Sequence, residues 1–258
     1  MLTLGLNLGE VTLSRAKGGG VSYLPEATAL FARMTTEPDA ARKGLINTLI
    51  GSLITAGVWA KMDALYVLAA HDAQAARLNW RSAAFNMTAI STPTFTADRG
   101  YAGDGVLSHL DCNFNPNAAI FMSQNSCHVG AWQRTAGLSA DAGVGGGNAN
   151  IGVNLRAIAA RVRLFSSTGF FPANTGSTGY VVGRRDGGAQ ELYKNAVSLG
   201  SGAVSNSAPT SDLYVGRTGS NYTTQQYAVV HFGSDLTPIE VAAAYDAFNA
   251  YLQAIGAA

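Results

Sequence analysis

The sequence predicts a mainly β protein, an antiparallel β-sandwich with an N-terminal helical segment and a C-terminal helix. Three observations support this prediction. From Phe85 onward, short runs of alternating apolar and polar residues recur about every ten residues. Thirty glycines among the 258 residues supply turns between these runs. A strongly capped helix pattern follows residue 236.

Composition limits the classes of partner. A hydrophobic fraction of 47% supports a substantial core, and 13% charged residues is well below the roughly 25% of ordinary soluble domains. The formal net charge of +1 gives no electrostatic reason to bind nucleic acid or an anionic membrane. Uncharged polar loops suit a surface that contacts sugars or other proteins, so we expect those partners instead.

The chain before the β region divides into two segments. Residues 1–35 form a poorly patterned lead-in without a secretion signal, and residues 36–84 form a helical segment. Thr36 and Asp39 predict a capping box for a helix over residues 36–57. Its apolar stripe comprises Leu45, Ile46, Leu49, Ile50, Leu53 and Ile54.

Residues 44–60 are the one candidate membrane span in the sequence. Polar residues such as Asn47 and Thr48 interrupt this stretch, which is also slightly short for a bilayer. We therefore expect a buried helix there and no membrane insertion. We then expect a short helical turn over residues 58–65, and a strand followed by a short helix over residues 66–80.

Residues 85–258 are predicted to form the β domain. The turn at Asp186-Gly187-Gly188 predicts a β-hairpin, whereas residues 156–165 fit a strand or a helix and are assigned to a strand by their context. Cys112 and Cys127 fall on successive strands, so a disulfide between them is open. Without a secretion signal, two buried free thiols are the preferred interpretation.

The C-terminal helix has a clear start and stop. Thr237 and Glu240 predict a capping box, and Pro238 occupies the first helical position. Gly256 predicts the end of the helix. The apolar positions on one face are Val241, Ala244, Tyr245, Phe248 and Leu252.

Four stretches of the C-terminal half resemble the laminin-G-like, concanavalin-A-like jelly rolls. These stretches are Val182-Gly183, Tyr193-Lys194-Asn195, Leu213-Tyr214-Val215-Gly216, and Leu236-Thr237 with Glu240 through Tyr245. In those domains a final strand leads into a short helix that packs beside the sheets. The resemblance covers residues 85–258 and implies a jelly-roll sandwich closed by the C-terminal helix.

The stretch from DALYVLAAHDAQAARLNW to PTFTADRGYAGDG is similar to proteins encoded in structural gene clusters of tailed phages, prophages and gene-transfer particles of proteobacteria. This resemblance spans residues 28–258. It implies a component of the virion surface, such as a spike, fibre or decoration protein. The partners it implies are other virion proteins, bound through the N-terminal segment, and further copies of the same chain. It assigns no functional residue.

Catalysis is not expected from the acidic residues. Glycoside hydrolysis requires two carboxylates across the scissile bond, and jelly-roll hydrolases carry Glu-x-Asp-x-x-Glu or a variant on one strand, which this chain lacks. Of the five glutamates, one lies in a predicted strand of the β domain, namely Glu191, since Glu240 is the helix cap. His109 and Asp111 share one strand face, where a polar row facing solvent is preferred over a metal or sugar site. We therefore expect a protein that is not an enzyme and needs no cofactor.

Calcium and sugar sites remain as candidates. The loop DRGYAGDG, with Asp98 and Asp104, is the best candidate for calcium, although two β-turn aspartates are preferred. A sugar site would combine an aromatic face with polar partners. The candidate residues are Tyr101 with Asp104, Trp132 with Gln133 and Arg134, and Tyr222 with Asn221.

Three functions follow as hypotheses. The first is a virion surface protein that binds host polysaccharide, with an exposed aromatic and polar patch far from the N-terminus. The second is a purely structural capsid or tail subunit, with those aromatic residues buried between subunits. The third and weakest is a polysaccharide-degrading enzyme, with two carboxylates facing one groove.

Overall fold

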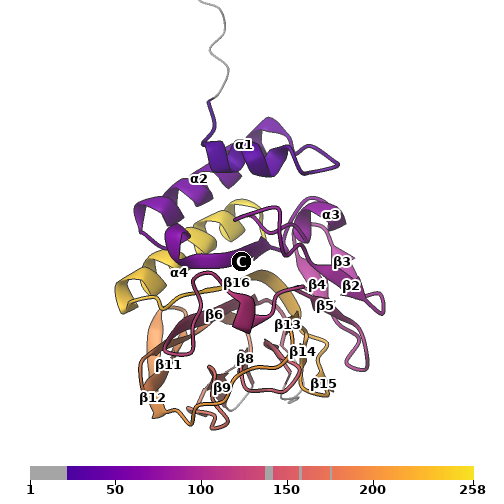
Figure 1. Ribbon diagram of the computed structural model, residues 1–258. Coiled ribbons are helices and arrows are strands. Elements are labelled where there is room, and N and C mark those ends of the chain that lie inside the picture. The colour runs from indigo at the N-terminus through magenta and orange to yellow at the C-terminus, as the bar shows by residue number, and fades with distance from the viewer. Residues whose placement is uncertain (1–21, 137–141, 157–158, 175) are drawn as a thin grey trace, which may run out of the picture.

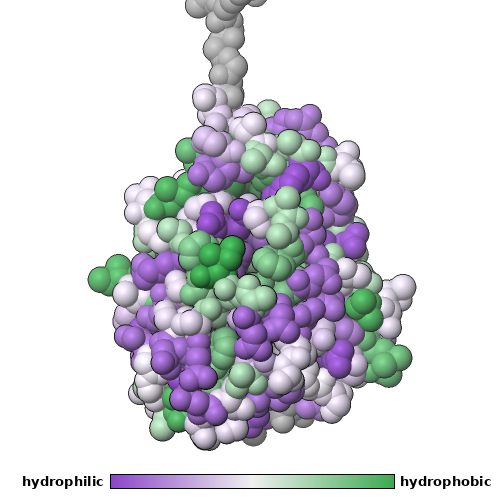
Figure 2. Space-filling view, in the orientation of Figure 1, coloured by the Kyte–Doolittle hydropathy of each residue, from purple (hydrophilic) through white to green (hydrophobic). Residues whose placement is uncertain are grey.

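Three layers stack in the computed structural model, which describes residues 22–136, 142–156, 159–174 and 176–258 (Figure 1). Helices form the first layer, sheet A the second and sheet B the third. The predicted mainly β sandwich with helices near both ends is confirmed. In the face shown in Figure 2, hydrophobic side chains form small separate groups among hydrophilic ones.

The described helices include one long helix from each end of the chain. They are α1 Pro25–Phe31, α2 Ala40–Thr55, α3 Ala73–Ala76 and α4 Pro238–Ala254, with the 3-10 turns η1 Trp59–Lys61 and η2 Pro116–Ala118. In the described part of the chain, no helix is both long and apolar enough to cross a bilayer.

Sheet A has the strand order β12-β11-β10-β6-β16-β4-β3, and β1 also pairs with β16. Its strands are β1 Met62–Val67, β3 Thr94–Thr96, β4 Gly100–Ala102, β6 Ser126–Gln133, β10 Gly179–Asp186, β11 Ala189–Lys194, β12 Val197–Ala203 and β16 Gln226–Gly233. Because β1 pairs antiparallel with β16, sheet A takes one strand from the segment before residue 85.

Sheet B has the strand order β15-β14-β7-β13-β5-β2, with β8 on β7 and β9 on β8. Its strands are β2 Thr88–Ile90, β5 His109–Asp111, β7 Val144–Gly146, β8 Gly152–Leu155, β9 Ala160–Arg163, β13 Leu213–Val215, β14 Arg217–Thr218 and β15 Asn221–Tyr222. The strand expected over residues 156–165 is therefore β9, with residues 157 and 158 outside the described part.

Two hydrophobic cores hold the layers together. Between the sheets lie Leu110, Cys112, Phe114 and Phe232, all at most 1% exposed. Between sheet A and the helices lie Trp132, Tyr180 and the buried faces of α2 and α4. Cys112 and Cys127 are buried free thiols, as preferred from the sequence, and burial raises the pKa of both.

The start of α2 differs from the sequence prediction. Asp39 is itself the N-cap, and its carboxylate accepts a hydrogen bond from the Arg42 amide, so the capping box of Thr36 and Asp39 is wrong. The helix is also shorter than residues 36–57. The lead-in was expected to lack pattern, but its described part forms α1, which begins at Pro25.

The C-terminal helix confirms its predicted cap. The Thr237 hydroxyl accepts from the Glu240 amide, and the Glu240 carboxylate accepts from the Thr237 amide. Burial favours the neutral form of Glu240, but Lys61, whose ammonium lies 2.6 Å from the carboxylate, and the cap bonds together lower its pKa. The predicted hairpin is also present, because Asp186 pairs with Ala189 across Gly187-Gly188.

Replacing Gly100 by alanine is expected to destabilise the fold by about 2 kcal/mol or more. A Cβ at this position would lie 1.9 Å from the Tyr227 carbonyl oxygen, and the φ of +104° disfavours any side chain. Urea unfolding of Gly100→Ala measures the loss. The matched control is Gly188→Ala, where a Cβ meets nothing within 4 Å. Equal stabilities for the two variants would contradict the described contact of β4 with β16.

Candidate functional site

The candidate site lies on the face of sheet B that points away from sheet A. Figure 1 shows α1, α2 and α4 stacked on the opposite side of the molecule, over sheet A. In β13, Leu213 and Val215 are buried in the inter-sheet core, so Tyr214 between them points outward. Tyr214 pairs with Asp111 of β5, which is partly exposed.

Four side chains form what we call the aromatic–arginine patch: His109, Tyr214, Arg217 and Tyr222. The Arg217 guanidinium carbon lies 4.6 Å from the centroid of the Tyr214 ring and 5.5 Å from that of Tyr222. The His109 ring centroid lies 5.3 Å from that of Tyr214, edge-on, and 5.7 Å from that of Tyr222. One cation therefore sits among three rings.

The β14–β15 hairpin explains why these side chains meet. Arg217 and Tyr222 are cross-strand partners, so their side chains share one face. Gly216 and Gly219 adopt φ values of +83° and +60°, which turn the chain before and after β14. The Arg217 Nε donates to the Gly219 carbonyl at 3.0 Å, which fixes the guanidinium over the rings.

His109 is the least exposed member of the patch, at 5%. A polar row facing solvent was expected here, and this is wrong for His109 because the two tyrosine rings cover it. Its Nδ1 lies 2.8 Å from the Leu107 carbonyl oxygen, which can only accept, so Nδ1 carries a proton. Nε2 lies 3.5 Å from Nη1 of Arg217 and is the acceptor of that pair.

The loop before β5 forms an apolar rim beside His109. Val106 and Leu107 are 65% and 56% exposed. One carboxylate oxygen of Asp104 accepts from the amides of Val106, Leu107 and Ser108 at 2.8–2.9 Å. These bonds hold the pKa of Asp104 well below its usual range. Asp104 thus shapes the loop that carries the rim.

Two carboxylates flank Tyr214. Burial raises the pKa of Asp212, and the charge of Asp111 raises it further. Burial and Asp111 also raise the pKa of Tyr214. Asp111 accepts a hydrogen bond from the Asn113 amide at 2.8 Å. The patch and the two carboxylates beside it therefore combine aromatic faces, guanidinium donors and carboxylate acceptors, which are the groups that hold a sugar ring and its hydroxyls.

The sequence-predicted sugar residues fall in three places. Tyr222 belongs to the patch, and Asn221 precedes it on β15 with an exposed side chain. Tyr101 is 5% exposed, donates to the Ala73 carbonyl and packs on Phe95. Trp132 is 7% exposed and stacks on Tyr245 beneath α4.

Arg134 and the calcium candidates are bound to other parts of the chain. Arg134 donates to the Ala257 carbonyl and to the Gln226 amide oxygen. Asp98 forms an ion pair with Arg42 at 2.7 Å. Among the described residues, no cluster of three His, Cys, Asp or Glu side chains is placed to hold a metal ion.

Sequence reasoning missed Tyr214 and Arg217 as site residues. The alternation of LYVGRT does carry the signal, because Leu213 and Val215 point inward and leave Tyr214 outside. What the sequence did not reveal is that β5 and β13 are neighbours, although about 100 residues separate them along the chain.

No protein-family model matches the sequence, and no curated protein matches it. Solved structures do match in three dimensions. The binding domain of botulinum neurotoxin serotype D aligns with a TM-score of 0.52 and 11% identity over 73% of this chain and 52% of that chain. Trypanosoma rangeli sialidase, in complex with a difluoro-KDN compound, aligns with a TM-score of 0.53 and 10% identity over 81% of this chain and 40% of that one.

A third structure is domain 4 of AbnA, an extracellular GH43 arabinanase from Geobacillus stearothermophilus, in complex with arabinotriose. It aligns with a TM-score of 0.49 and 16% identity over 70% of this chain and 97% of that chain. This chain therefore spans about half or less of the neurotoxin and sialidase structures. At these identities, the neurotoxin and sialidase matches show a shared β-sandwich fold.

Proposed function

We propose that this protein is a non-enzymatic surface component of a phage or phage-like particle, and that it binds polysaccharide on the host cell. The observation that carries the proposal is the aromatic–arginine patch on the outer face of sheet B. Its rings offer faces for stacking on a sugar, and Arg217, Asp111 and Asn221 offer hydrogen-bond partners for hydroxyls.

The arrangement of the layers supports the same proposal. α1, α2 and α4 lie on one side of sheet A, whereas the β13, β14 and β15 strands lie beyond it on the other side (Figure 1). A subunit held to a particle through its N-terminal side would therefore present the patch outward. The sequence resemblance to phage structural proteins supports the setting. The same fold occurs in the binding domain of a botulinum neurotoxin and in a sialidase whose structure holds a difluoro-KDN compound.

Binding to whole host cells tests the proposal. Labelled full-length protein is mixed with cells of the proteobacterial host that carry or lack their capsular and O-antigen polysaccharide. We expect saturable binding that is lost with the polysaccharide. Folded protein in its native oligomer that binds neither cell type would overturn the proposal.

A structural subunit without a glycan site is the second candidate. α2 and α4 border a groove of about 680 Å³ lined by small side chains such as Gly51, Ser52 and Ala247. Ile239, at the start of α4, is 82% exposed. A second copy of the chain could cover these apolar surfaces. Sedimentation of the wild type and of Ala247→Arg tests this candidate. It predicts that the wild type is an oligomer and that Ala247→Arg is a monomer.

Polysaccharide hydrolysis is the third candidate, and Asp111 with Asp212 is the carboxylate pair that would serve it. The charge of Asp111 contributes to the raised pKa of Asp212, so the two carboxylates lie near each other, whereas a hydrolase requires its two carboxylates across the scissile bond. We propose instead that they accept hydrogen bonds from sugar hydroxyls. Reducing-end assays on bound polysaccharide are expected to show no turnover. Turnover that Asp212→Asn abolishes would establish the enzyme.

A further inference from the structure

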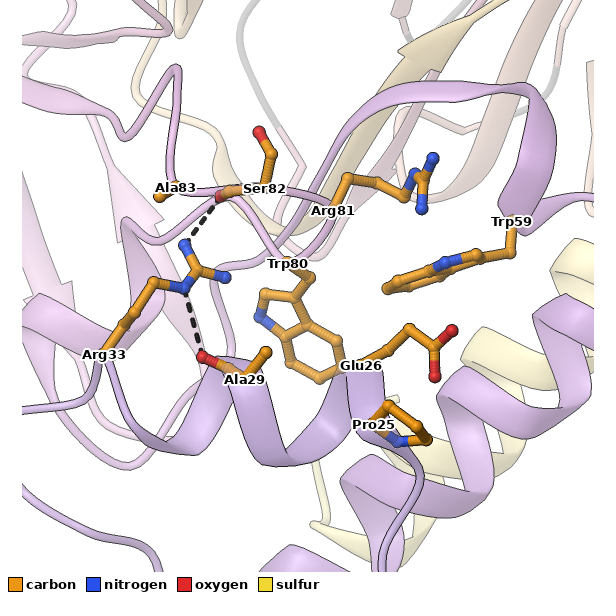
Figure 3. Close-up of a pocket in the computed structure, with 9 residues that line it drawn as sticks. All are labelled: Pro25, Glu26, Ala29, Arg33, Trp59, Trp80, Arg81, Ser82 and Ala83. Atoms are coloured by element: carbon orange, nitrogen blue, oxygen red, sulfur yellow. Dashed lines mark hydrogen bonds between the residues drawn. The ribbon is translucent and has the colours of Figure 1, made fainter.

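A second concave site lies in the helical layer, between α1, η1 and the segment after Trp80 (Figure 3). Its volume is about 400 Å³, within the roughly 300–1,000 Å³ of small-ligand sites. The walls include two of the three tryptophans of the chain, Trp59 and Trp80, with Glu26, Arg33 and Arg81. We call this cavity the tryptophan pocket.

Arg81 is held so that part of its guanidinium stays available. Its guanidinium carbon lies 5.0 Å from the centroid of the Trp59 ring and 6.0 Å from that of Phe121. Nε donates to the Met62 carbonyl at 3.1 Å. A guanidinium that stacks on an indole and is fixed through Nε keeps its Nη donors along its edge. That edge matches the two oxygens of a carboxylate or sulfate.

Arg33 has a different part in the pocket. Its Nη1 and Nη2 donate to the carbonyls of Ser82 and Asn79, both at 2.7 Å, and its Nε bonds to Ala29. Figure 3 shows Arg33 bridging α1 to the segment that carries Ser82. Arg33 therefore builds the wall, and Arg81 remains the cation that can meet a ligand.

The indole N–H of Trp80 is an unsatisfied donor in the wall of the pocket. Trp80 is 3% exposed, and among the described residues its Nε1 has no hydrogen-bond partner. Leaving a buried donor without a partner is unfavourable, so a ligand acceptor that reaches it would be favoured. Figure 3 places Nε1 on the side of the ring that faces Ala29 and Arg33, two other wall residues.

We infer that the tryptophan pocket binds an anionic sugar unit, with its carboxylate or sulfate on the Arg81 guanidinium and its ring along the wall that the two tryptophans help to build. Glu26, whose carboxylate Figure 3 places near Trp59, would accept hydrogen bonds from sugar hydroxyls. A doubly anionic ligand would be repelled by Glu26, so one negative charge per unit is the expected class. The ligand class rests on the proposed glycan function, but the site is separate from the patch.

Indole N–H resonances of ¹⁵N-labelled full-length protein test the inference directly. Methyl glucuronoside and a sulfated methyl glucoside are the anionic probes, and methyl glucoside is the neutral one. We expect saturable shifts of the Trp59 and Trp80 signals with an anionic probe. The Trp132 signal, from a ring buried under α4, should stay in place. Equal shifts with the neutral probe, or none with either anionic probe, would overturn the inference.

Two variants assign the charge contact. Arg81→Gln is expected to weaken binding of the anionic probe at least about tenfold. Arg77→Gln is the matched control, because Arg77 bonds to the Ala73 carbonyl outside the pocket and should leave affinity unchanged. Equal losses in the two variants would contradict a role for Arg81.

Failure of this inference is distinguishable from failure of the proposed function. Tyr222→Ala should leave the glucuronoside titration unchanged while host-cell binding falls. A shifted Trp59 signal without host-cell binding would leave the pocket standing and reject the proposed function. Host-cell binding without any indole shift would support the proposed function and reject the tryptophan pocket as a binding site.

Discussion

Lowering the pH from 7 to 5 is expected to reduce the free energy of unfolding by about 4 kcal/mol, through two buried histidines. His128 and His231 are both 0% exposed, on neighbouring strands beneath α4. Burial lowers the pKa of His128 to about 4, against the hydrogen bond to the Ser234 carbonyl, which raises it, and smaller opposing effects of Lys61 and Glu240. Burial and the neighbouring His128 lower the pKa of His231 well below its usual value.

The hydrogen bonds of the pair explain why both rings stay neutral. His128 Nδ1 donates to the Ser234 carbonyl, which can only accept. His128 Nε2 therefore accepts from His231 Nδ1 at 2.9 Å. His231 Nε2 in turn accepts from the Tyr180 hydroxyl at 2.7 Å. Every ring nitrogen has a partner, and an added proton would have no acceptor within this chain of bonds.

The sign of the effect follows from the pKa directions. A histidine with a lowered folded pKa binds protons in the unfolded state first, so stability falls as the pH drops below about 6.5. Each ring then costs about 1.4 kcal/mol per pH unit, down to about pH 4 for His128. Carboxylates with a lowered pKa, such as Glu240, contribute stability that is lost only at lower pH, as the pH falls below their unfolded pKa.

Urea unfolding between pH 7 and pH 5 measures this effect. The double variant His128→Gln/His231→Gln is expected to be less stable at pH 7 and to lose most of the pH dependence. His71→Gln is the matched control, because His71 is partly exposed and bonds to the Thr36 carbonyl. A wild-type profile that stays flat to pH 5 would contradict the neutral buried pair.

Replacing Arg185 by methionine is expected to cost at least about 3 kcal/mol of stability. Arg185 is 1% exposed, and its hydrogen-bond partners are uncharged oxygen acceptors. It donates to the carbonyls of Leu164, Phe165 and Gly187 and to the side chains of Asn125 and Asn206. Methionine would fill the space but leave these buried acceptors without a donor.

Thermal and urea unfolding of Arg185→Met measure that cost. Arg99→Met is the matched control, because Arg99 is partly exposed and donates to the adjacent Asp98 carbonyl. Its expected change is within about 0.5 kcal/mol. A loss for Arg185→Met no larger than for Arg99→Met would show that water reaches the acceptors.

The sequence predicts the elements whose signals are local. The α4 cap at Thr237 and the turn at Gly187-Gly188 depend on residues within a few positions of each other, and both are confirmed. The predicted start of α2 was wrong because Thr36 and Asp39 both suit an N-cap, and the N-cap in the structure is Asp39. Helix α1 has too few turns to show a periodic pattern.

Features that depend on the pairing of strands far apart in the chain could not be predicted from the sequence. β1 lies far from β16 along the chain, so its place in sheet A could not be read from periodicity. The patch has the same origin, because β5, β13 and β15 meet through sheet B. Of its members, Tyr222 was predicted as a sugar-site residue because Asn221 lies beside it in the sequence, whereas Arg217 needed the hairpin register.

The measurement that tests the glycan site most directly is the affinity of Tyr222→Ala for purified host polysaccharide, by isothermal titration calorimetry of the full chain. The matched control is Phe171→Ala, because Phe171 is an exposed ring with Arg156 5.7 Å away, outside the patch. We predict at least about tenfold weaker binding for Tyr222→Ala and unchanged binding for Phe171→Ala, with both variants folded. Wild-type affinity in Tyr222→Ala would contradict a glycan site at the aromatic–arginine patch.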